Sequence, residues 1–163
     1  MKTALCPGTY DPVTNGHLDI ISRAADKFDK VVVAVVKNPP RKQLLFSLEE
    51  RLQFLREATK DLPNVLVAVL DGLVVDCARK HGADALVKGL RAVMDFEYEF
   101  QMAQLNKVLA PELETIYFMA SAGVGYVSSS GVKEIAMFGG GVDGLVPDMV
   151  AKRFAEIYRS LEA

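Results

Sequence analysis

Residues 3–17 read TALCPGTYDPVTNGH, and this stretch decides the fold class. Residues 3–6 are short and apolar on both faces, as buried parallel strands are, and an amphipathic helical pattern begins at Gly16. The segment between them is therefore a strand-to-helix turn, which is where open α/β sheets bind ligands. Gly8 and Gly16 allow the chain to come close to a phosphate, and a helix start supplies free N–H groups and a positive dipole end.

His17 falls in the first turn of the expected helix, where it would face an anion bound at that helix end. Two interpretations of the turn stay open on physical grounds alone. In one it is a phosphate-binding loop, and in the other Thr14 caps the helix and His17 is a surface residue. The P-loop and G-x-G-x-x-G spacings do not occur in this turn, which argues against the usual kinase, ATPase and dehydrogenase sites.

The rest of the chain alternates short apolar runs with amphipathic helical patterns. Further strands are predicted at 31–36, 65–70, 85–87 and 115–119, and helices at 16–28, 47–60, 73–81, 94–109, 130–138 and 148–161. This alternation predicts an α/β, doubly wound parallel sheet of five strands in the order 3-2-1-4-5. Ser47 and Glu50 predict a capping box at the start of the second helix. The glycines at 139–141 follow a helix, which favours a connector over a phosphate loop.

Length and composition set the outer limits of the interpretation. The 163 residues fit a single domain, 1–163, and a net charge of −2 gives no global field that would attract nucleic acid or an anionic membrane. The longest apolar run, 31–36, is too short to cross a bilayer, and the first residues do not form a signal peptide, so we expect a cytoplasmic protein. Cys6 and Cys77 lie in apolar contexts without metal-type spacing and are expected to be free buried thiols.

The first turn also resembles a known family. Thr14 to His17 match the T/H-x-G-H signature of the nucleotidyltransferase superfamily, and the longer string PGTYDPVTNGHLD at 7–19 closely resembles the phosphopantetheine adenylyltransferases. The resemblance continues through FSLEER at 46–51, GLRAVMDFEYE at 89–99 and SSSGVKE at 128–134, and it covers essentially the whole chain. It implies a Rossmann-like fold, a homohexamer, Mg²⁺, and adenylyl transfer from ATP to 4′-phosphopantetheine, which gives dephospho-coenzyme A and pyrophosphate.

The resemblance also implies roles for individual residues, while the metal ligands stay unknown. Catalytic roles fall on His17, Lys42 and Arg91. ATP contacts fall on Thr9, Tyr10, His17, Gly89, Leu90, Arg91, Glu99, Val124, Gly125, Tyr126, Val127, Ser128, Ser129 and Ser130. Contacts to phosphopantetheine fall on Thr9, Lys42, Val74, Lys88, Met102, Leu105 and Asn106.

Most of these residues have a plainer structural interpretation as well. Lys42 lies in a basic loop that solvent alone would explain, Met102 and Leu105 have the spacing of core residues, and serines such as Ser130 commonly cap helices. Lys88 stands where the family usually carries arginine, so the charge is kept while the planar two-pronged geometry is lost. The 121–126 segment is also smaller than the family pattern, which leaves the adenine contacts open.

Two other functions remain as alternatives. One is another small nucleotidyltransferase, acting on nicotinamide mononucleotide or glycerol 3-phosphate, and the other is a non-catalytic nucleotide-binding domain. The segment from Lys88 to Glu99 and the triple serine resemble the pantetheine enzymes. The sequence shows no Ser–His or Cys–His constellation for covalent catalysis, so we expect direct in-line attack by a substrate phosphate on the α-phosphorus of ATP.

Overall fold

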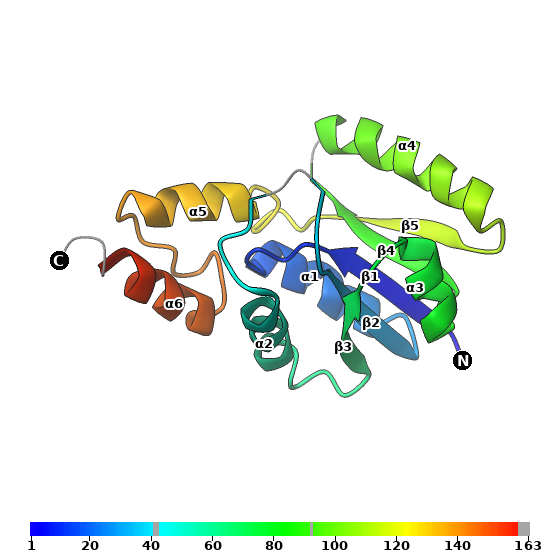
Figure 1. The fold of residues 1–163 in the computed structure, drawn as a ribbon, viewed down its shortest axis with the longest axis horizontal. Helices are drawn as coiled ribbons and strands as arrows, with labels where there is room; N and C mark the ends of the chain where they lie inside the picture. Colours follow the sequence, from blue (N-terminus) through cyan, green and yellow to red (C-terminus); the bar gives the residue numbers. More distant parts are fainter. Residues whose placement is uncertain (41–42, 92, 160–163) are drawn as a thin grey trace.

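Five parallel strands form one sheet through the middle of the molecule, in the order β3-β2-β1-β4-β5 (Figure 1). The structure is a computed structural model, and it describes residues 1–40, 43–91 and 93–159. The predicted strand order and parallel direction are confirmed. The strands are β1 (Thr3–Gly8), β2 (Lys30–Val36), β3 (Val65–Leu70), β4 (Ala85–Leu90) and β5 (Glu114–Met119).

Each predicted helix is present, with ends that differ by up to three residues from the predicted ones where both are described. The helices are α1 (Asn15–Ala25), α2 (Leu48–Ala58), α3 (Val74–His81), α4 (Val93–Leu109), α5 (Ser129–Met137) and α6 (Asp148–Arg159). The predicted end of the last helix, 160–161, lies outside the described residues. The capping box of α2 is confirmed, since the Ser47 N–H donates to Glu50 at 2.9 Å and the Glu50 N–H donates to the Ser47 hydroxyl at 3.2 Å.

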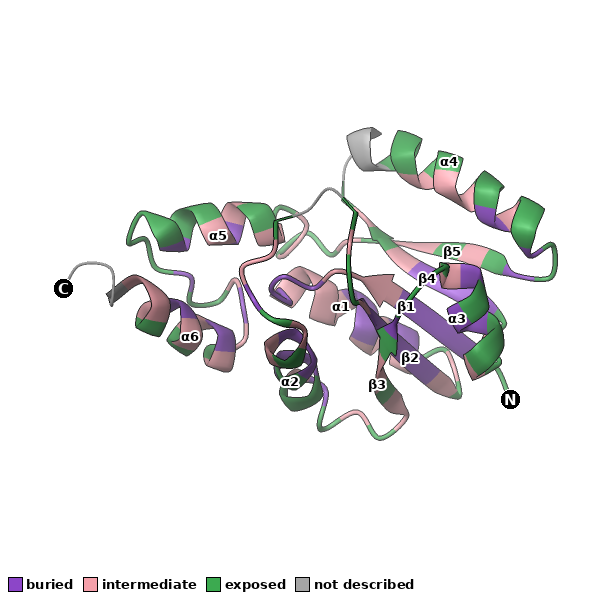
Figure 2. Cartoon of the chain, viewed as in Figure 1, coloured by how far each residue is buried: buried purple, intermediate pink, exposed green. Residues whose placement is uncertain are grey.

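The sheet separates two hydrophobic cores. On one face, Val31, Val33 and Val35 of β2 pack in a cluster with side chains of α1, α2, α5 and α6. On the other face, Val32 and Ala34 of β2 belong to a cluster with side chains of α3 and of the segment after α4. Successive residues of a strand point to opposite faces, so a strand buried on both sides must be apolar throughout. Figure 2 shows the central strands as the most continuously buried part of the chain.

The end of β1 differs from the sequence prediction in a way that matters for the site. We predicted a strand over residues 3–6, and Pro7, which follows it, cannot donate a ladder hydrogen bond. The strand continues to Gly8, paired with β2 along its whole length, but its pairing with β4 covers only Ala4 and Leu5. Pro7 is therefore tolerated where β4 turns away from β1, and this divergence opens the carboxyl end of the sheet between the two strands.

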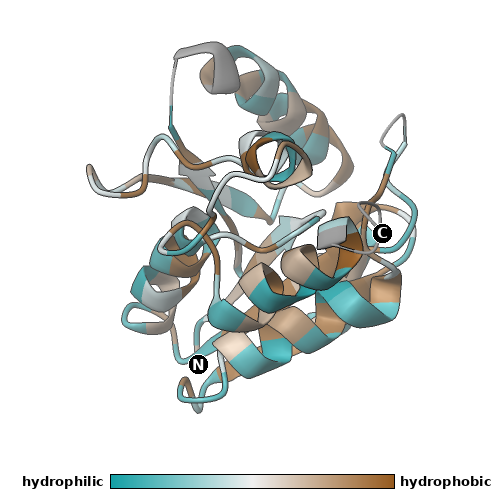
Figure 3. Cartoon of the chain, turned by 90° about the vertical axis from the view of Figure 1, so that its left-hand side faces the viewer, coloured by the Kyte–Doolittle hydropathy of each residue, from teal (hydrophilic) through white to brown (hydrophobic). Residues whose placement is uncertain are grey.

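Apart from α4, the helices carry the amphipathic pattern expected of elements that cover a sheet. Figure 3 shows hydrophobic and hydrophilic residues alternating along them. Among the helices of the described residues, none combines the length and the apolar character that a membrane span requires. Both cysteines are buried and free, as predicted.

Candidate active site

A cavity of about 720 Å³ lies at the carboxyl ends of β1 and β4. These strands lie at the point where the chain switches from one side of β1 to the other, which is the usual ligand site in such sheets. Four parts of the chain line it: the β1–α1 turn, the segment before α2, the β4–α4 region, and the stretch from 120 into α5. The predicted site residues that line it are Thr9, Tyr10, His17, Lys88, Gly89, Arg91, Glu99, Val124, Val127, Ser128, Ser129 and Ser130.

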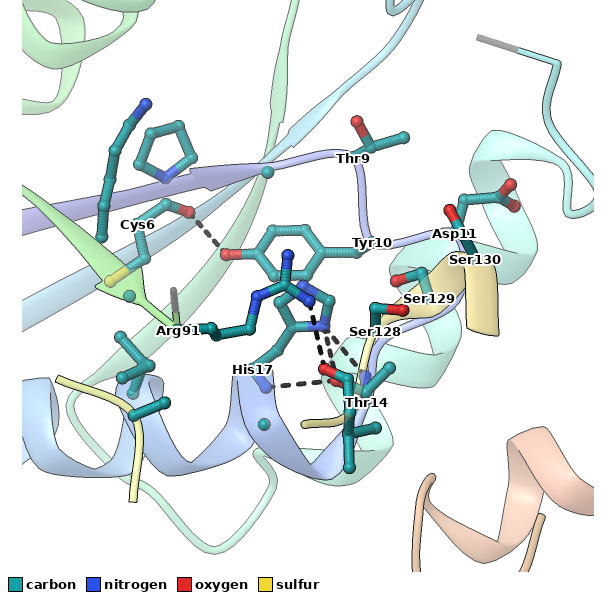
Figure 4. A pocket seen from close by; sticks show the side chains of 18 of the residues that line it. Cys6, Thr9, Tyr10, Asp11, Thr14, His17, Arg91, Ser128, Ser129 and Ser130 are labelled. Carbon is teal, nitrogen blue, oxygen red and sulfur yellow. Dashed lines mark hydrogen bonds between the residues drawn. The ribbon is translucent and has the colours of Figure 1, made fainter. Parts of the chain in front are cut away.

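His17 occupies the third position of α1 and completes a capping box with Thr14 (Figure 4). The Thr14 N–H donates to His17 Nδ1 at 3.0 Å, while the His17 N–H donates to the Thr14 hydroxyl at 3.3 Å. Because Nδ1 accepts a hydrogen bond from a backbone N–H, the proton of the neutral ring resides on Nε2. The cap therefore presents an N–H donor at a helix N-terminus inside the cavity, so the capping and phosphate-binding interpretations of this turn are compatible.

Tyr10 packs against the ring of His17. The two rings meet edge to face with centroids 5.0 Å apart, and the Tyr10 hydroxyl donates to the Cys6 carbonyl at 3.0 Å. Burial raises the pKa of Tyr10 well above its ordinary value, and burial also raises the pKa of the Cys6 thiol to about 12. Gly8 is required here, because a Cβ atom at that position would lie 2.8 Å from the Tyr10 ring. The phenol of Tyr10 is thus committed to the protein, and only its ring and backbone are left for a ligand.

Two cationic side chains reach the cavity from the end of β4. Lys88 forms a 2.7 Å ion pair with Glu99 of α4, and both side chains are about four-fifths buried, at 19% and 20% exposed. Arg91 donates from its guanidinium to the Val127 carbonyl at 3.3 Å, which joins the end of β4 to the 120–127 segment. Between them, Gly89 packs so closely on α1 that a Cβ atom there would lie 2.9 Å from Ile20.

The second helix N-terminus at the cavity belongs to α5. Ser128 is its N-cap and accepts a hydrogen bond from the Gly131 N–H at 3.0 Å, so our sequence interpretation of Ser130 as the cap was wrong. Three consecutive serines give the same local signal, and the register of the helix decides among them. The Ser129 hydroxyl donates to the Pro12 carbonyl at 2.8 Å, which joins this helix start to the β1–α1 turn.

The sequence did not reveal the part that Asp11 and Lys133 play at the cavity. The buried Asp11 carboxylate accepts from the N–H groups of Leu45 and Phe46, at 3.0 and 2.9 Å, and forms a 2.8 Å ion pair with Lys133. One carboxylate thus joins the first turn, the segment before α2, and α5. Lys133 is 122 positions from Asp11, so no local pattern could have indicated the pair.

Several predicted residues do not line this cavity. Leu90, Gly125 and Tyr126 flank it, and the Leu90 carbonyl accepts from the Ala120 N–H at 2.9 Å. Four residues implied to hold phosphopantetheine lie on α3 and α4, outside the lining: Val74, Met102, Leu105 and Asn106. Lys42 lies outside the described residues.

Comparison with known proteins agrees with this architecture. The model of the cytidylyltransferase-like family matches residues 5–135. A phosphopantetheine adenylyltransferase from Caldanaerobacter subterraneus subsp. tengcongensis is 55% identical over 159 residues, which cover 98% of this chain and 99% of that protein. The chain belongs to the phosphopantetheine adenylyltransferase family. A phosphopantetheine adenylyltransferase from Rubrobacter xylanophilus is 54% identical, over 97% of this chain and 96% of its own.

A solved structure shares the fold at much lower sequence similarity. A Vibrio parahaemolyticus protein, whose name assigns it to the nicotinate-nucleotide adenylyltransferases, superposes with a TM-score of 0.70 at 15% identity. The match covers 95% of this chain and 92% of that one. At this identity the likeness extends to the fold alone, and the substrate of this phosphopantetheine adenylyltransferase family member rests on the closer relatives.

Proposed function

We propose that the chain transfers the adenylyl group of ATP to the phosphate of 4′-phosphopantetheine, the reaction for which its relatives are named. The observation that carries this proposal is the convergence of two helix N-termini on one cavity. His17 at the start of α1 and Ser128 at the start of α5 line the same space as Lys88 and Arg91. Backbone N–H groups at helix starts, together with cations, suit two phosphate-bearing substrates bound side by side.

The chemistry requires positioning more than proton transfer. The phosphate of phosphopantetheine is already an anionic nucleophile, so its oxygen can attack the α-phosphorus of ATP directly. A new oxygen–phosphorus bond forms, the bond from the α-phosphorus to the bridging oxygen breaks, and pyrophosphate leaves with that electron pair. Orientation of the reactants and stabilisation of the developing charge supply the rate enhancement.

The lining residues divide between the two substrates in this proposal. The Nε2–H of His17 donates to an α-phosphate oxygen, Arg91 and the serines at 128–130 hold the triphosphate, and Lys88 holds the phosphate of phosphopantetheine. Lys42 is proposed to assist the transferred group on the strength of the sequence resemblance. Glu99 forms an ion pair with Lys88, so its contact to ATP would accompany a change of partner for that lysine.

Magnesium fits this site as a companion of the nucleotide. In the described residues, no three His, Cys, Asp or Glu side chains come together as a metal-binding group. The cavity carboxylates Asp11 and Glu99 both hold a lysine in an ion pair. Mg²⁺ commonly keeps several water ligands and binds through substrate phosphates, so we propose that it is held mainly by the triphosphate. When bound, it would neutralise charge on the phosphates.

Release of pyrophosphate tests the proposed function. The purified chain mixed with ATP, Mg²⁺ and 4′-phosphopantetheine is expected to release one pyrophosphate for each dephospho-coenzyme A formed. Parallel reactions with nicotinamide mononucleotide or glycerol 3-phosphate as the acceptor are expected to release very little. Turnover with one of those acceptors alone would assign the chain a different substrate, and ATP binding without any turnover would indicate a nucleotide-binding domain.

Lys88→Ala is expected to raise the KM for phosphopantetheine by about ten- to hundredfold, because a phosphate loses a charge-assisted hydrogen bond. Lys88→Arg is expected to keep that KM or lower it, because a guanidinium can bind phosphate with two parallel N–H groups. Steady-state kinetics at saturating ATP measure both variants. Lys60→Ala is a matched control, because Lys60 is an exposed cation paired with Glu57 on the surface. An unchanged KM in Lys88→Ala would remove this lysine from the site.

We also propose that copies of the chain associate, as the homohexamer implied by the resemblance. The support from the structure is α4, where large apolar side chains are exposed on the single chain: Phe96, Phe100, Leu105, Val108 and Leu109. Exposed apolar surface of this kind is typical of protein–protein contacts. A mass of 17.8 kDa in solution, that of one chain, would contradict association.

A further inference from the structure

The segment 120–127 forms one wall of the cavity. None of residues 121–125 carries a large polar side chain. It folds as a compact turn, in which the Ser121 carbonyl accepts from the N–H groups of Val124 and Gly125, at 3.0 and 2.9 Å. Because residues 121–125 are small, a ligand at this wall is met mainly by backbone and small apolar groups. The position of the whole turn therefore decides how well it fits a ligand.

Asp19 of α1 binds the start of this turn through hydrogen bonds. Its carboxylate accepts from the Ser121 hydroxyl at 2.8 Å and from the Ser121 N–H at 3.3 Å. Arg23, one helical turn further along, donates to Asp19 at 3.2 Å and to the Met119 carbonyl at 2.7 Å. The guanidinium of Arg23 also lies 5.2 Å from the centre of the Phe118 ring. Two side chains of α1 thus hold the end of β5 and the start of the turn.

The same helix carries His17, so this contact links two parts of the proposed site. At the N-terminal end of α1, a Cβ atom on Gly16 would lie 3.2 Å from the Val124 carbonyl, which shows how closely the turn approaches the helix. At its far end, the turn is held by the bond from Arg91 to the Val127 carbonyl. The turn is therefore fixed at its two ends, by Asp19 and by Arg91.

Asp19 is suited to this role because it is ionised at neutral pH. Partial burial by itself would raise the pKa of Asp19, but the hydrogen bonds from Ser121 and the hydrogen bond and charge of Arg23 outweigh burial, and the pKa is lowered. Hydrogen bonds to a charged acceptor are stronger than those between neutral groups.

We propose that Asp19 is a positioning residue for the nucleotide. It keeps the 120–127 turn in the position that ATP binding requires, and it does not itself contact either substrate. The inference rests on the proposed function, since it takes the nucleotide to be the ligand at this wall. Phosphopantetheine meets Lys88 on another side of the cavity in that proposal, so the effect of Asp19 is confined to ATP.

The test is the Asp19→Ala variant, compared with the wild type in two measurements. The KM for ATP is expected to rise about tenfold or more, because the turn loses two hydrogen bonds to a charged group, whereas the KM for phosphopantetheine stays within about twofold. Hydrogen exchange of the backbone amides at 121–127 is expected to quicken about tenfold or more without any substrate present. Ser121→Ala keeps the backbone bond and is expected to show a smaller rise in the KM for ATP.

Glu57→Gln is the matched control, since it removes a carboxylate from an exposed ion pair with Lys60 at the end of α2 and should leave all these values unchanged. A rise in both KM values together, or faster exchange with an unchanged KM for ATP, would reduce Asp19 to a general structural role and overturn the inference. If the wild type failed to release pyrophosphate, the proposed function would fail by itself. The exchange measurement would still test the role of Asp19, and unchanged exchange in Asp19→Ala would refute the claim that Asp19 fixes the turn.

Discussion

Replacing His17 by alanine is expected to lower kcat by about a hundredfold or more. Loss of one preorganised donor to the developing charge of a transition state typically costs about 3 kcal/mol. The Nε2–H of His17 is such a donor, because the bond from the Thr14 N–H to Nδ1 fixes the proton on the other nitrogen. The KM for ATP is expected to change much less, since the helix N-termini and the serines still hold the triphosphate. Rapid-quench or steady-state kinetics at saturating substrates would measure the effect.

The capping box adds a stability effect that has to be separated from the catalytic one. His17→Ala leaves the Thr14 N–H without its partner, which is expected to lower the free energy of unfolding by about 1 kcal/mol. His17→Gln is the informative companion, because glutamine at the third helical position can accept from the cap N–H. We expect His17→Gln to recover the melting temperature while kcat stays low. Near-normal kcat in both variants would refute the proposed role, even if the family assignment stands.

The strand order could be predicted because it depends on a pattern that the whole chain repeats. Apolar runs alternate with amphipathic helices, and right-handed crossovers leave few possible arrangements. The exact ends of the elements depend on neighbours distant in sequence. Pro7 is a reasonable stop signal, yet β1 continues past it because β4 has already turned away. Ser128 and Ser130 likewise could not be told apart as caps by local chemistry.

The same distinction between local patterns and neighbours distant in sequence applies to the residues of the candidate site. His17, Lys88 and Arg91 could be named because each follows a predicted strand or opens a predicted helix. Asp11 could not be given its role, since its partners lie 34, 35 and 122 positions away. The residues implied for phosphopantetheine on α3 and α4 came from resemblance alone, and in this chain they lie outside the cavity lining.

The buried location of Arg51 was not predicted either. Because of its surroundings, it is the position at which we expect substitution to lower the free energy of unfolding most. This arginine of α2 is completely buried, and its guanidinium donates to the carbonyls of Thr9, Val36 and Lys37, at 2.8, 2.8 and 3.3 Å. It thereby joins the β1–α1 turn to the end of β2. Burial lowers the pKa of Arg51, and the negative charge of Asp11 opposes that shift. A cation in an amphipathic helix normally indicates the solvated face, so the sequence pattern predicts the opposite location.

Arg51→Met is expected to lower the free energy of unfolding by about 3 kcal/mol or more, because three carbonyls of the β1–α1 turn and the end of β2 lose their donor. For a chain of this size that corresponds to a melting temperature lower by about 6–12 °C. Arg51→Lys keeps the charge but can reach fewer carbonyls from one point, so an intermediate loss is expected. Urea titration of both variants measures the effect.

The control is Arg56→Met on the same helix, where an exposed arginine pairs with Glu49 and a change below about 0.5 kcal/mol is expected. Equal losses at the two positions would show that the buried hydrogen bonds of Arg51 do not stabilise the fold. If Arg51→Lys stays folded, it should raise the KM of both substrates, because Arg51 holds the carbonyl of Thr9, for which the family resemblance implies contacts to both ATP and phosphopantetheine.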